Sequence, residues 1–184
     1  MAAGTDLLAY RDEIADCTRC PLAQGRTQVV FGAGDPHADL MFVGEAPGFH
    51  EDKQGVPFVG AAGKLLEQLL AQIGLERSDV YIANVLKCRP PGNRDPQPEE
   101  IEACEGHLWR QIELIEPRVV ATLGGRRVLL YPLYHPAAAL YTPRMLDVLQ
   151  ADFGRIPELL GRDVEPKPQP VLATSEPAVQ LGLF

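Results

Sequence analysis

Short apolar runs alternate with helical patterns along most of this chain, and that alternation constrains its fold more than any other feature. The runs at residues 39–43, 80–86 and 118–123 have the length and the apolar character of buried strands. Between them, residues 65–73 and 98–115 place their apolar side chains at helical spacing. Strands that alternate with helices build a sheet with helices on its faces. The order therefore predicts an α/β fold, a three-layer α/β/α sandwich with a central four-stranded, mostly parallel sheet.

The connection that precedes the fourth strand is unusually short for such a fold. Residues 118–123 and 128–133 both have the composition of strands, and only the four residues GGRR lie between them. A parallel crossover usually takes about a dozen residues or more. Two alternatives are open: the two strands form an antiparallel hairpin through the glycines, or a crossover segment is absent from this chain.

One domain and a tail account for the length of 184 residues. We assign residues 1–162 to the domain and residues 163–184 to a flexible tail, because the tail has four prolines and no periodicity. The formal net charge of −8 argues against a protein that coats nucleic acid through bulk charge, though not against a local basic patch. No apolar run reaches the roughly 18 residues of a membrane span, and the N-terminus lacks a secretory pattern, so we expect a cytoplasmic protein.

Four cysteines form one close pair, Cys17 and Cys20, and two distant single residues, Cys88 and Cys104. This pattern favours four ligands to one metal centre. The alternative is a redox-active pair accompanied by two buried thiols. Zinc and an iron–sulfur cluster both accept four thiolates, and the single close pair favours the cluster without deciding the matter.

Polar and aromatic residues gather where the predicted strands end. The first strand leads into a glycine-rich acidic loop with Glu45 and Glu51, and Phe58 follows among small residues. Asn84 lies inside the second strand, and His135 ends the fourth. Ligands of open α/β sheets bind at the carboxyl ends of the strands. Taken singly, each residue also has an ordinary interpretation, such as a solvated turn, a core ring or a hydrogen-bonded amide.

Taken together, these segments resemble the family 4 uracil-DNA glycosylases of bacteria and archaea. The matching segments are CTRCPL (17–22), GEAPGFHEDKQGVPFVGAAGKLL (44–66), NVLKCRPPGNRDPQPEEIEAC (84–104) and YHPAAAL (134–140). The resemblance covers roughly residues 5–160. It implies a monomeric, nucleoid-associated DNA-repair enzyme for single- or double-stranded DNA. Such an enzyme flips deoxyuridine out of the helix and hydrolyses its N-glycosidic bond, which releases uracil and leaves an abasic site.

The resemblance also implies a [4Fe–4S] cluster on Cys17, Cys20, Cys88 and Cys104. It implies a uracil pocket in which Phe58 stacks on the base and Asn84 reads the uracil edge through its amide donor and acceptor. His135 would stabilise the uracil anion as it leaves. A small residue, Ala46, stands in this pocket where other uracil glycosylases carry an acid.

Two glutamates of the first loop are candidates for positioning or activating the water that attacks C1′ of the sugar. Glu51 is the first choice for positioning or activating this water, and Glu45 is the second. A carboxylate nearby would also stabilise the oxocarbenium-like sugar.

Basic residues after the second strand, together with residues near the last helix, are the predicted DNA contacts. Four of them would bind phosphate, and one leucine would act as a wedge in the base stack. The phosphate candidates are Lys87, Arg89, Arg94 and Arg144, and the wedge is Leu140.

The tail ends in QLGLF, which resembles the short peptide that binds the bacterial sliding clamp. Gln180, Leu181, Leu183 and Phe184 would fill the groove of the clamp. A chance apolar terminus is the alternative for so short a motif.

Family members carry a helix and a loop at the point where this sequence passes from Gly124 to Gly125, so the resemblance favours an internal deletion. If that deletion misplaces the fourth strand and His135, the chain would be a catalytically impaired iron–sulfur protein that binds DNA or the clamp. A small iron–sulfur electron-transfer module is a third alternative, although it leaves the acidic loop unexplained.

Overall fold

A five-stranded sheet forms the centre of the computed structural model, which describes residues 2–123, 132–133 and 136–159. The strand order is β1-β3-β2-β4-β5. Four strands run parallel, and the two-residue strand β1 adds an antiparallel edge beside β3. The predicted four-stranded parallel core is therefore confirmed, with one short strand added. The strands are β1 (Ala33–Gly34), β2 (Leu40–Gly44), β3 (Tyr81–Asn84), β4 (Val119–Leu123) and β5 (Pro132–Leu133).

The short connection after β4 nevertheless joins two parallel strands. Thr122 is paired with Pro132 and Leu123 with Leu133, so the antiparallel hairpin considered above is wrong. The described part of β5 begins opposite Thr122, so the chain has returned by one residue along β4 at that point rather than along a whole strand. The connecting residues 124–131 lie outside the described part of the chain.

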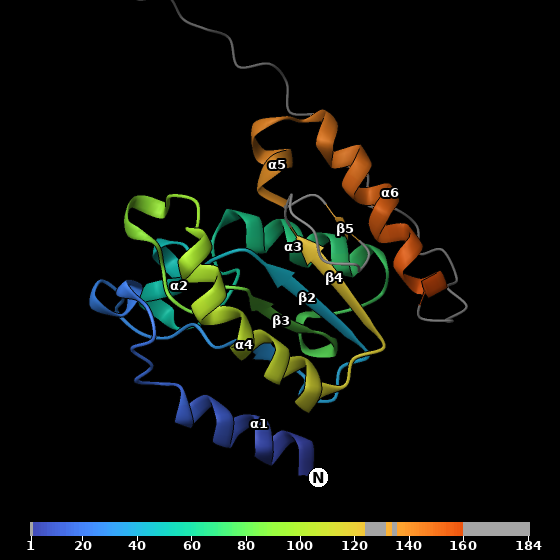
Figure 1. Cartoon of the computed structure of the whole chain (residues 1–184). Helices are drawn as coiled ribbons and strands as arrows, with labels where there is room; N and C mark the ends of the chain where they lie inside the picture. Colours follow the sequence, from blue (N-terminus) through green and yellow to red (C-terminus); the bar gives the residue numbers. More distant parts are fainter. Residues whose placement is uncertain (1, 124–131, 134–135, 160–184) are drawn as a thin grey trace, which may run out of the picture.

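Helices cover both faces of the sheet, as Figure 1 shows. On one face lie α1 (Ala2–Glu13) and α4 (Pro98–Ile115), which contact each other. On the other face lie α3 (Ala61–Gln72), α5 (Pro136–Tyr141) and α6 (Arg144–Leu159). The three-layer arrangement expected from the sequence is therefore present.

The central strand β2 supplies side chains to both apolar layers. Leu40 and Phe42 pack with the buried residues of α3 and α6, where Phe42 stacks on Phe153 at a ring distance of 5.5 Å. Met41 and Val43 pack with the buried residues of α1 and α4. A strand buried on both faces has a continuous apolar sequence rather than an alternating one, which explains the run at residues 39–43.

Several short elements lie outside the predicted helices. The glycine-rich loop after β2 contains a helix, α2 (Phe49–Gln54), and three 3₁₀ turns complete the described elements: η1 (Pro21–Gln24), η2 (Arg77–Asp79) and η3 (Pro91–Asn93). No helix among the described residues is long and apolar enough to cross a membrane. The proposed tail, residues 163–184, lies outside the described residues, and so does the boundary at residue 162.

Candidate active site and cysteine cavity

Asn84 and Phe58 meet at the carboxyl end of the sheet, above Gly44. The parallel register pairs Gly44, the last residue of β2, with Asn84, the last residue of β3. A Cβ atom on Gly44 would overlap Asn84 Oδ1 and lie 2.8 Å from two ring carbons of Phe58. The missing side chain of Gly44 is therefore what allows the amide and the ring to approach each other.

The side chain of Asn84 has an unsatisfied acceptor. The residue is only 2% exposed, and its Oδ1 atom accepts no hydrogen bond from any described residue. A buried polar atom without a partner costs roughly 1–3 kcal/mol, so native proteins rarely retain one without a reason. An N–H donor from outside the described residues would complete this hydrogen bond.

Phe58 adopts a backbone conformation that is unfavourable for a residue with a side chain. Its φ angle is +53°, in the left-handed region, which costs about 1–3 kcal/mol. Arg77 stabilises this turn, because its guanidinium donates to the carbonyl oxygens of Phe58 (2.8 Å) and Pro57. Gly63 packs so closely that any Cβ atom would overlap the Phe58 carbonyl. The pocket ring is therefore held in place before any ligand arrives.

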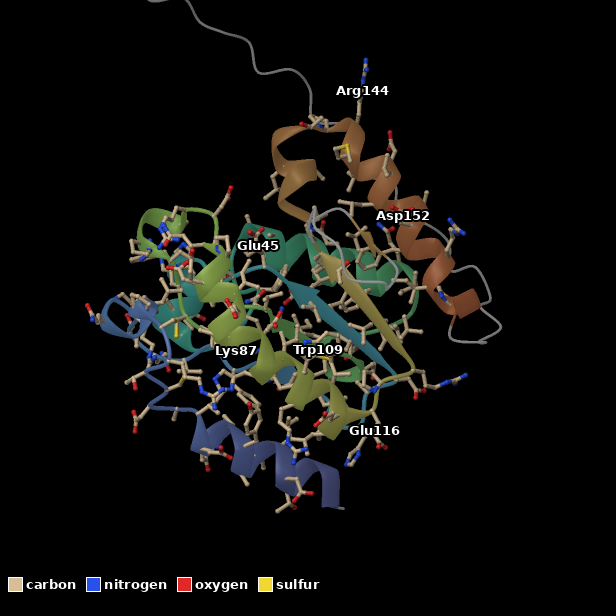
Figure 2. All side chains as sticks on the ribbon, in the orientation of Figure 1. Glu45, Lys87, Trp109, Glu116, Arg144 and Asp152 are labelled. Atoms are coloured by element: carbon tan, nitrogen blue, oxygen red, sulfur yellow. The ribbon has the colours of Figure 1, made fainter. Side chains whose placement is uncertain are left out.

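Glu51 uses its whole carboxylate to brace the same loop. Its Oε1 atom accepts hydrogen bonds from the amides of Val59 (2.9 Å) and Gly60 (3.0 Å), and Oε2 accepts one from Gly48 (3.1 Å). A carboxylate bound to three amides is poorly available to activate water. Glu45, which Figure 2 labels, is exposed. No described residue forms a hydrogen bond with its side chain.

All four cysteines line one cavity, and none forms a disulfide. Arg26 Nη1 lies 3.5 Å from Cys88 Sγ, and the backbone amide of Lys87 donates to Cys104 Sγ at 3.3 Å. N–H groups directed at the sulfur atoms suit thiolate ligands. Within the described residues, no group of three or more His, Cys, Asp or Glu side chains is arranged to hold a single metal ion.

His107 connects α1 to the cysteine cavity. Its Nδ1 atom lies 2.6 Å from the Tyr10 hydroxyl, and Nε2 lies 3.4 Å from Cys17 Sγ. Burial lowers the pKa of His107, which favours a neutral ring. The tautomer that accepts from Tyr10 and donates from Nε2 to the sulfur satisfies both contacts. No sequence pattern marked His107.

Burial also shapes the protonation of the two inner cysteines. It raises the pKa of Cys104 to about 11 and raises the pKa of Cys88, although the Arg26 guanidinium opposes the shift at Cys88. As free thiols, both side chains would be neutral at physiological pH. Thiolate ligands at these positions therefore need a bound cation to balance their charge.

The expectation that Lys87 binds phosphate requires correction, because its side chain is buried and only 2% exposed. Its ammonium group donates to the backbone oxygen of Asn84 (2.7 Å) and to Oε1 of Gln111. Burial lowers the pKa of Lys87 to about 7. Lys87 therefore connects the cysteine cavity to the end of β3 inside the protein. A positive charge in a sequence does not reveal whether its side chain is buried.

The other predicted DNA contacts lie at the surface. Arg89 donates to Asn93 Oδ1 at 2.6 Å and is partly exposed. Arg94 forms a bidentate pair with Glu100, at 2.9 and 2.6 Å. Leu140 and Arg144 are exposed on α5 and at the start of α6, where Figure 2 shows Arg144 pointing away from the sheet.

The remaining predicted site residues are partly outside the described chain. Ala46 is half-buried and packs against the apolar cluster around Cys88 and Cys104, so it links the first loop to the cavity. His135 lies outside the described residues. The same holds for the four residues predicted to bind the clamp: Gln180, Leu181, Leu183 and Phe184.

An α/β sandwich with a buried amide and an aromatic ring at the carboxyl ends of its strands, and with a four-cysteine cavity, belongs to the class of α/β proteins that bind ligands at this edge of the sheet. The model of the uracil DNA glycosylase superfamily matches residues 31–155. Type-4 uracil-DNA glycosylases of Sulfurisphaera tokodaii and Archaeoglobus fulgidus are each 45% identical over 181 aligned residues. These alignments cover 81% and 82% of this chain and 82% and 91% of the relatives. A third, of Thermotoga maritima, is 54% identical over 113 residues, covering 61% of this chain and 59% of the relative. The chain belongs to the type-4 uracil-DNA glycosylases of this superfamily.

The alignment lengths also bear on the short connection after β4. The match to the Sulfurisphaera protein spans 181 aligned positions, whereas 81% of this chain is about 149 residues. About 32 aligned positions therefore have no residue in this chain. A segment missing between β4 and β5 agrees with that difference.

Proposed function

We propose that this protein is a monofunctional uracil-DNA glycosylase that hydrolyses the N-glycosidic bond of deoxyuridine flipped out of DNA. The observation that carries the proposal is the buried Oδ1 atom of Asn84, which has no hydrogen-bond partner among the described residues and lies beside the ring of Phe58. Uracil offers an N–H donor at N3 and a carbonyl acceptor at O4, which match the oxygen and nitrogen of one amide. Cytosine offers an acceptor at N3 and a donor at N4, so it would leave the amide mismatched.

The reaction itself requires charge stabilisation at the sugar and at the base. Water adds to C1′ as the bond to N1 breaks, and the bonding electrons leave with uracil as an anion. Glu45 is our candidate for stabilising the oxocarbenium-like sugar and orienting the water, because it is exposed and Glu51 is bound to backbone amides. A donor from His135 would stabilise the anion. Phe58 would stack on the extruded base.

An excision assay with Asn84→Ala tests this function. Single-stranded DNA containing one uracil is incubated with the protein, and alkali then cleaves any abasic site. The wild type should produce breaks at uracil, and Asn84→Ala should lower kcat/KM by about 100-fold or more, because the variant loses the hydrogen bonds to the base. Gln68→Ala, which changes an exposed amide on α3, is the matched control and should retain activity. Excision by Asn84→Ala at the wild-type rate would refute the proposed reading of uracil.

A second candidate function is a catalytically impaired protein that binds DNA or the sliding clamp. The short connection between β4 and β5 favours it, because this connection precedes the segment that carries His135. The same assay decides between the two. Absence of any break at uracil, in a protein that unfolds cooperatively and binds single-stranded DNA, would support the impaired binder.

We further propose that Cys17, Cys20, Cys88 and Cys104 hold a [4Fe–4S] cluster, which would serve as a structural cross-link. Their common cavity and the N–H donors of Arg26, Lys87 and His107 support this assignment. One close pair of cysteines and two single cysteines favours an iron–sulfur cluster over zinc, although both accept four thiolates. Iron, sulfide and zinc analysis of anaerobically purified protein tests it. Zinc at one equivalent without iron would contradict the cluster.

The tail supports a third proposal, namely that its last five residues bind the bacterial sliding clamp while the enzyme acts as a monomer. Deleting Gln180–Phe184 should abolish clamp binding and leave excision on short oligonucleotides unchanged. Deleting residues 166–170 of the same tail is the control and should leave clamp binding intact. Clamp affinity that survives the first deletion would disprove the proposal.

A further inference from the structure

Phe49 exposes about half of its side chain at the start of the helix that carries Glu51. It is 48% exposed and begins α2, the helix that follows the first pocket loop. Cations lie close to the ring: the Arg89 guanidinium carbon is 5.1 Å and Lys53 Nζ is 5.9 Å from its centroid. The ring of His50 meets it edge-on at 5.5 Å. An exposed aromatic ring flanked by cations is the combination that single-stranded nucleic-acid sites use.

The charges around Phe49 favour a polyanion over an apolar partner. Neither acid of α2 forms a salt bridge with Lys53 or Arg89 among the described residues: Glu51 binds three backbone amides, and Asp52 is buried with its Oδ1 atom on the amide of Thr27. Arg89 is oriented by Asn93 through its Nε atom, and Nη1 and Nη2 carry further N–H donors.

One carboxylate fixes the distance between Phe49 and the pocket ring. Glu51 binds the amide of Gly48, which precedes Phe49, and the amide of Val59, which follows Phe58. The two aromatic residues are therefore attached to the same rigid turn. A strand that places one base on Phe58 would carry its neighbouring nucleotides past this turn.

We propose that Phe49, Arg89 and Lys53 form a platform for single-stranded DNA that stacks a base flanking the flipped nucleotide. The base lies against the Phe49 ring, and the adjoining phosphates pair with the two cations. The position of the platform relative to the flipped nucleotide rests on the proposed glycosylase function, whereas its binding of uracil-free DNA does not.

The test measures binding of a fluorescent oligothymidine without uracil by anisotropy. Phe49→Ala should weaken binding on the order of 5- to 100-fold, since stacking of one base contributes about 1–3 kcal/mol. Phe49→Trp should retain binding because it keeps an aromatic face, and Phe49→Leu should resemble Phe49→Ala. Trp109→Ala removes an equally exposed ring (50%) from α4 and should bind as the wild type does. Equal affinity of Phe49→Ala and Trp109→Ala, or full binding by Phe49→Leu, would overturn the platform.

Two further measurements separate the platform from the proposed function and from misfolding. Arg89→Ala should reduce the slope of log affinity against log salt by about one, as expected for one lost phosphate contact. In uracil excision, Phe49→Ala should raise KM and leave kcat unchanged, which a damaged fold would not do. If Phe49→Ala loses oligothymidine binding but the wild type never excises uracil, the platform is retained and the glycosylase function is refuted. If the wild type excises uracil but Phe49→Ala binds oligothymidine as the wild type does, the glycosylase function is retained and the platform is refuted.

Discussion

Arg77 illustrates how single residues prepare the pocket from a distance. It follows Phe58 by 19 positions, yet its guanidinium binds the carbonyl groups of both Pro57 and Phe58. The left-handed backbone at Phe58 is stable only because such contacts offset its strain. Arg77 is therefore a positioning residue for the ring that is proposed to stack on uracil.

We expect Arg77→Ala to reduce kcat/KM for uracil excision roughly 5- to 100-fold, because the released strain at Phe58 amounts to about 1–3 kcal/mol. The change should raise KM more than it lowers kcat, since the stacking ring is lost and the charged groups remain. Arg77→Lys should recover part of the activity. Glu67→Ala is the control, because it removes only the exposed carboxylate at 3.4 Å from the same guanidinium. Unchanged steady-state kinetics in Arg77→Ala would show that Phe58 holds its conformation without it.

Residue type and position were enough to propose some members of the site from the sequence, but not others. An amide at the end of an apolar strand and a ring in a glycine-rich loop indicated Asn84 and Phe58. Arg77 and Gly63 were not marked, because their role depends on contacts across the fold. The prediction that Lys87 lies at the surface was wrong. A basic residue close to other basic residues suggests a surface position, whereas the side chain of Lys87 is buried.

At the scale of elements, α4 begins with a paired carboxylate. Glu100 accepts two hydrogen bonds from Arg94 and one from the amide of Gln97, at the first turn of the helix. The hydrogen bonds from Arg94 lower the pKa of Glu100 below its ordinary value of 4.5. A carboxyl group with a lower pKa in the folded state stabilises the fold above its unfolded pKa and loses that effect as the pH falls.

Glu100→Gln should therefore lower the free energy of unfolding at neutral pH and lose less stability than the wild type when the pH falls below about 4.5. Urea unfolding at a series of pH values measures both effects. Glu99→Gln, at an exposed neighbouring position, is the control and should behave as the wild type does. An equal loss of stability on acidification in Glu100→Gln and the wild type would assign the acid sensitivity to other carboxyl groups.

Elements with strong apolar periodicity lie where the sequence predicted them, whereas elements formed by local turns were not predicted. The parallel core strands and the helices α3 and α4 lie where apolar spacing indicated them. Helix α2 was hidden in a loop rich in glycine and proline, because its six residues show no repeat. The strand expected at residues 128–133 is described only at Pro132–Leu133, where its pairing with β4 depends on the whole sheet.

At the scale of the whole molecule, the cysteine cavity joins parts of the chain that are far apart in sequence. Cys17 and Cys20 follow α1, Cys88 follows β3, and Cys104 lies in α4. Apart from this cavity, α1 is held mainly by the apolar side chains that it packs against α4, among them Leu7. The proposed cluster would close the loop between the N-terminal segment and the centre of the fold.

Removing the cluster should consequently release α1 before the sheet. The loop that the cluster would close runs from Cys20 to Cys88. By the loop-closure estimate used for covalent cross-links, closing a loop of this length contributes about 4 kcal/mol to the free energy of unfolding. In Cys20→Ser, we expect lower thermal stability and faster amide hydrogen exchange in α1, with protection of β2 and β3 largely retained because both strands lie in the centre of the sheet. Arg26→Lys keeps the charge beside Cys88 and should change exchange far less. If exchange in α1 stays at the wild-type rate after iron and sulfide are lost, packing on α4 alone holds this helix, and the cross-linking role of the four cysteines is refuted.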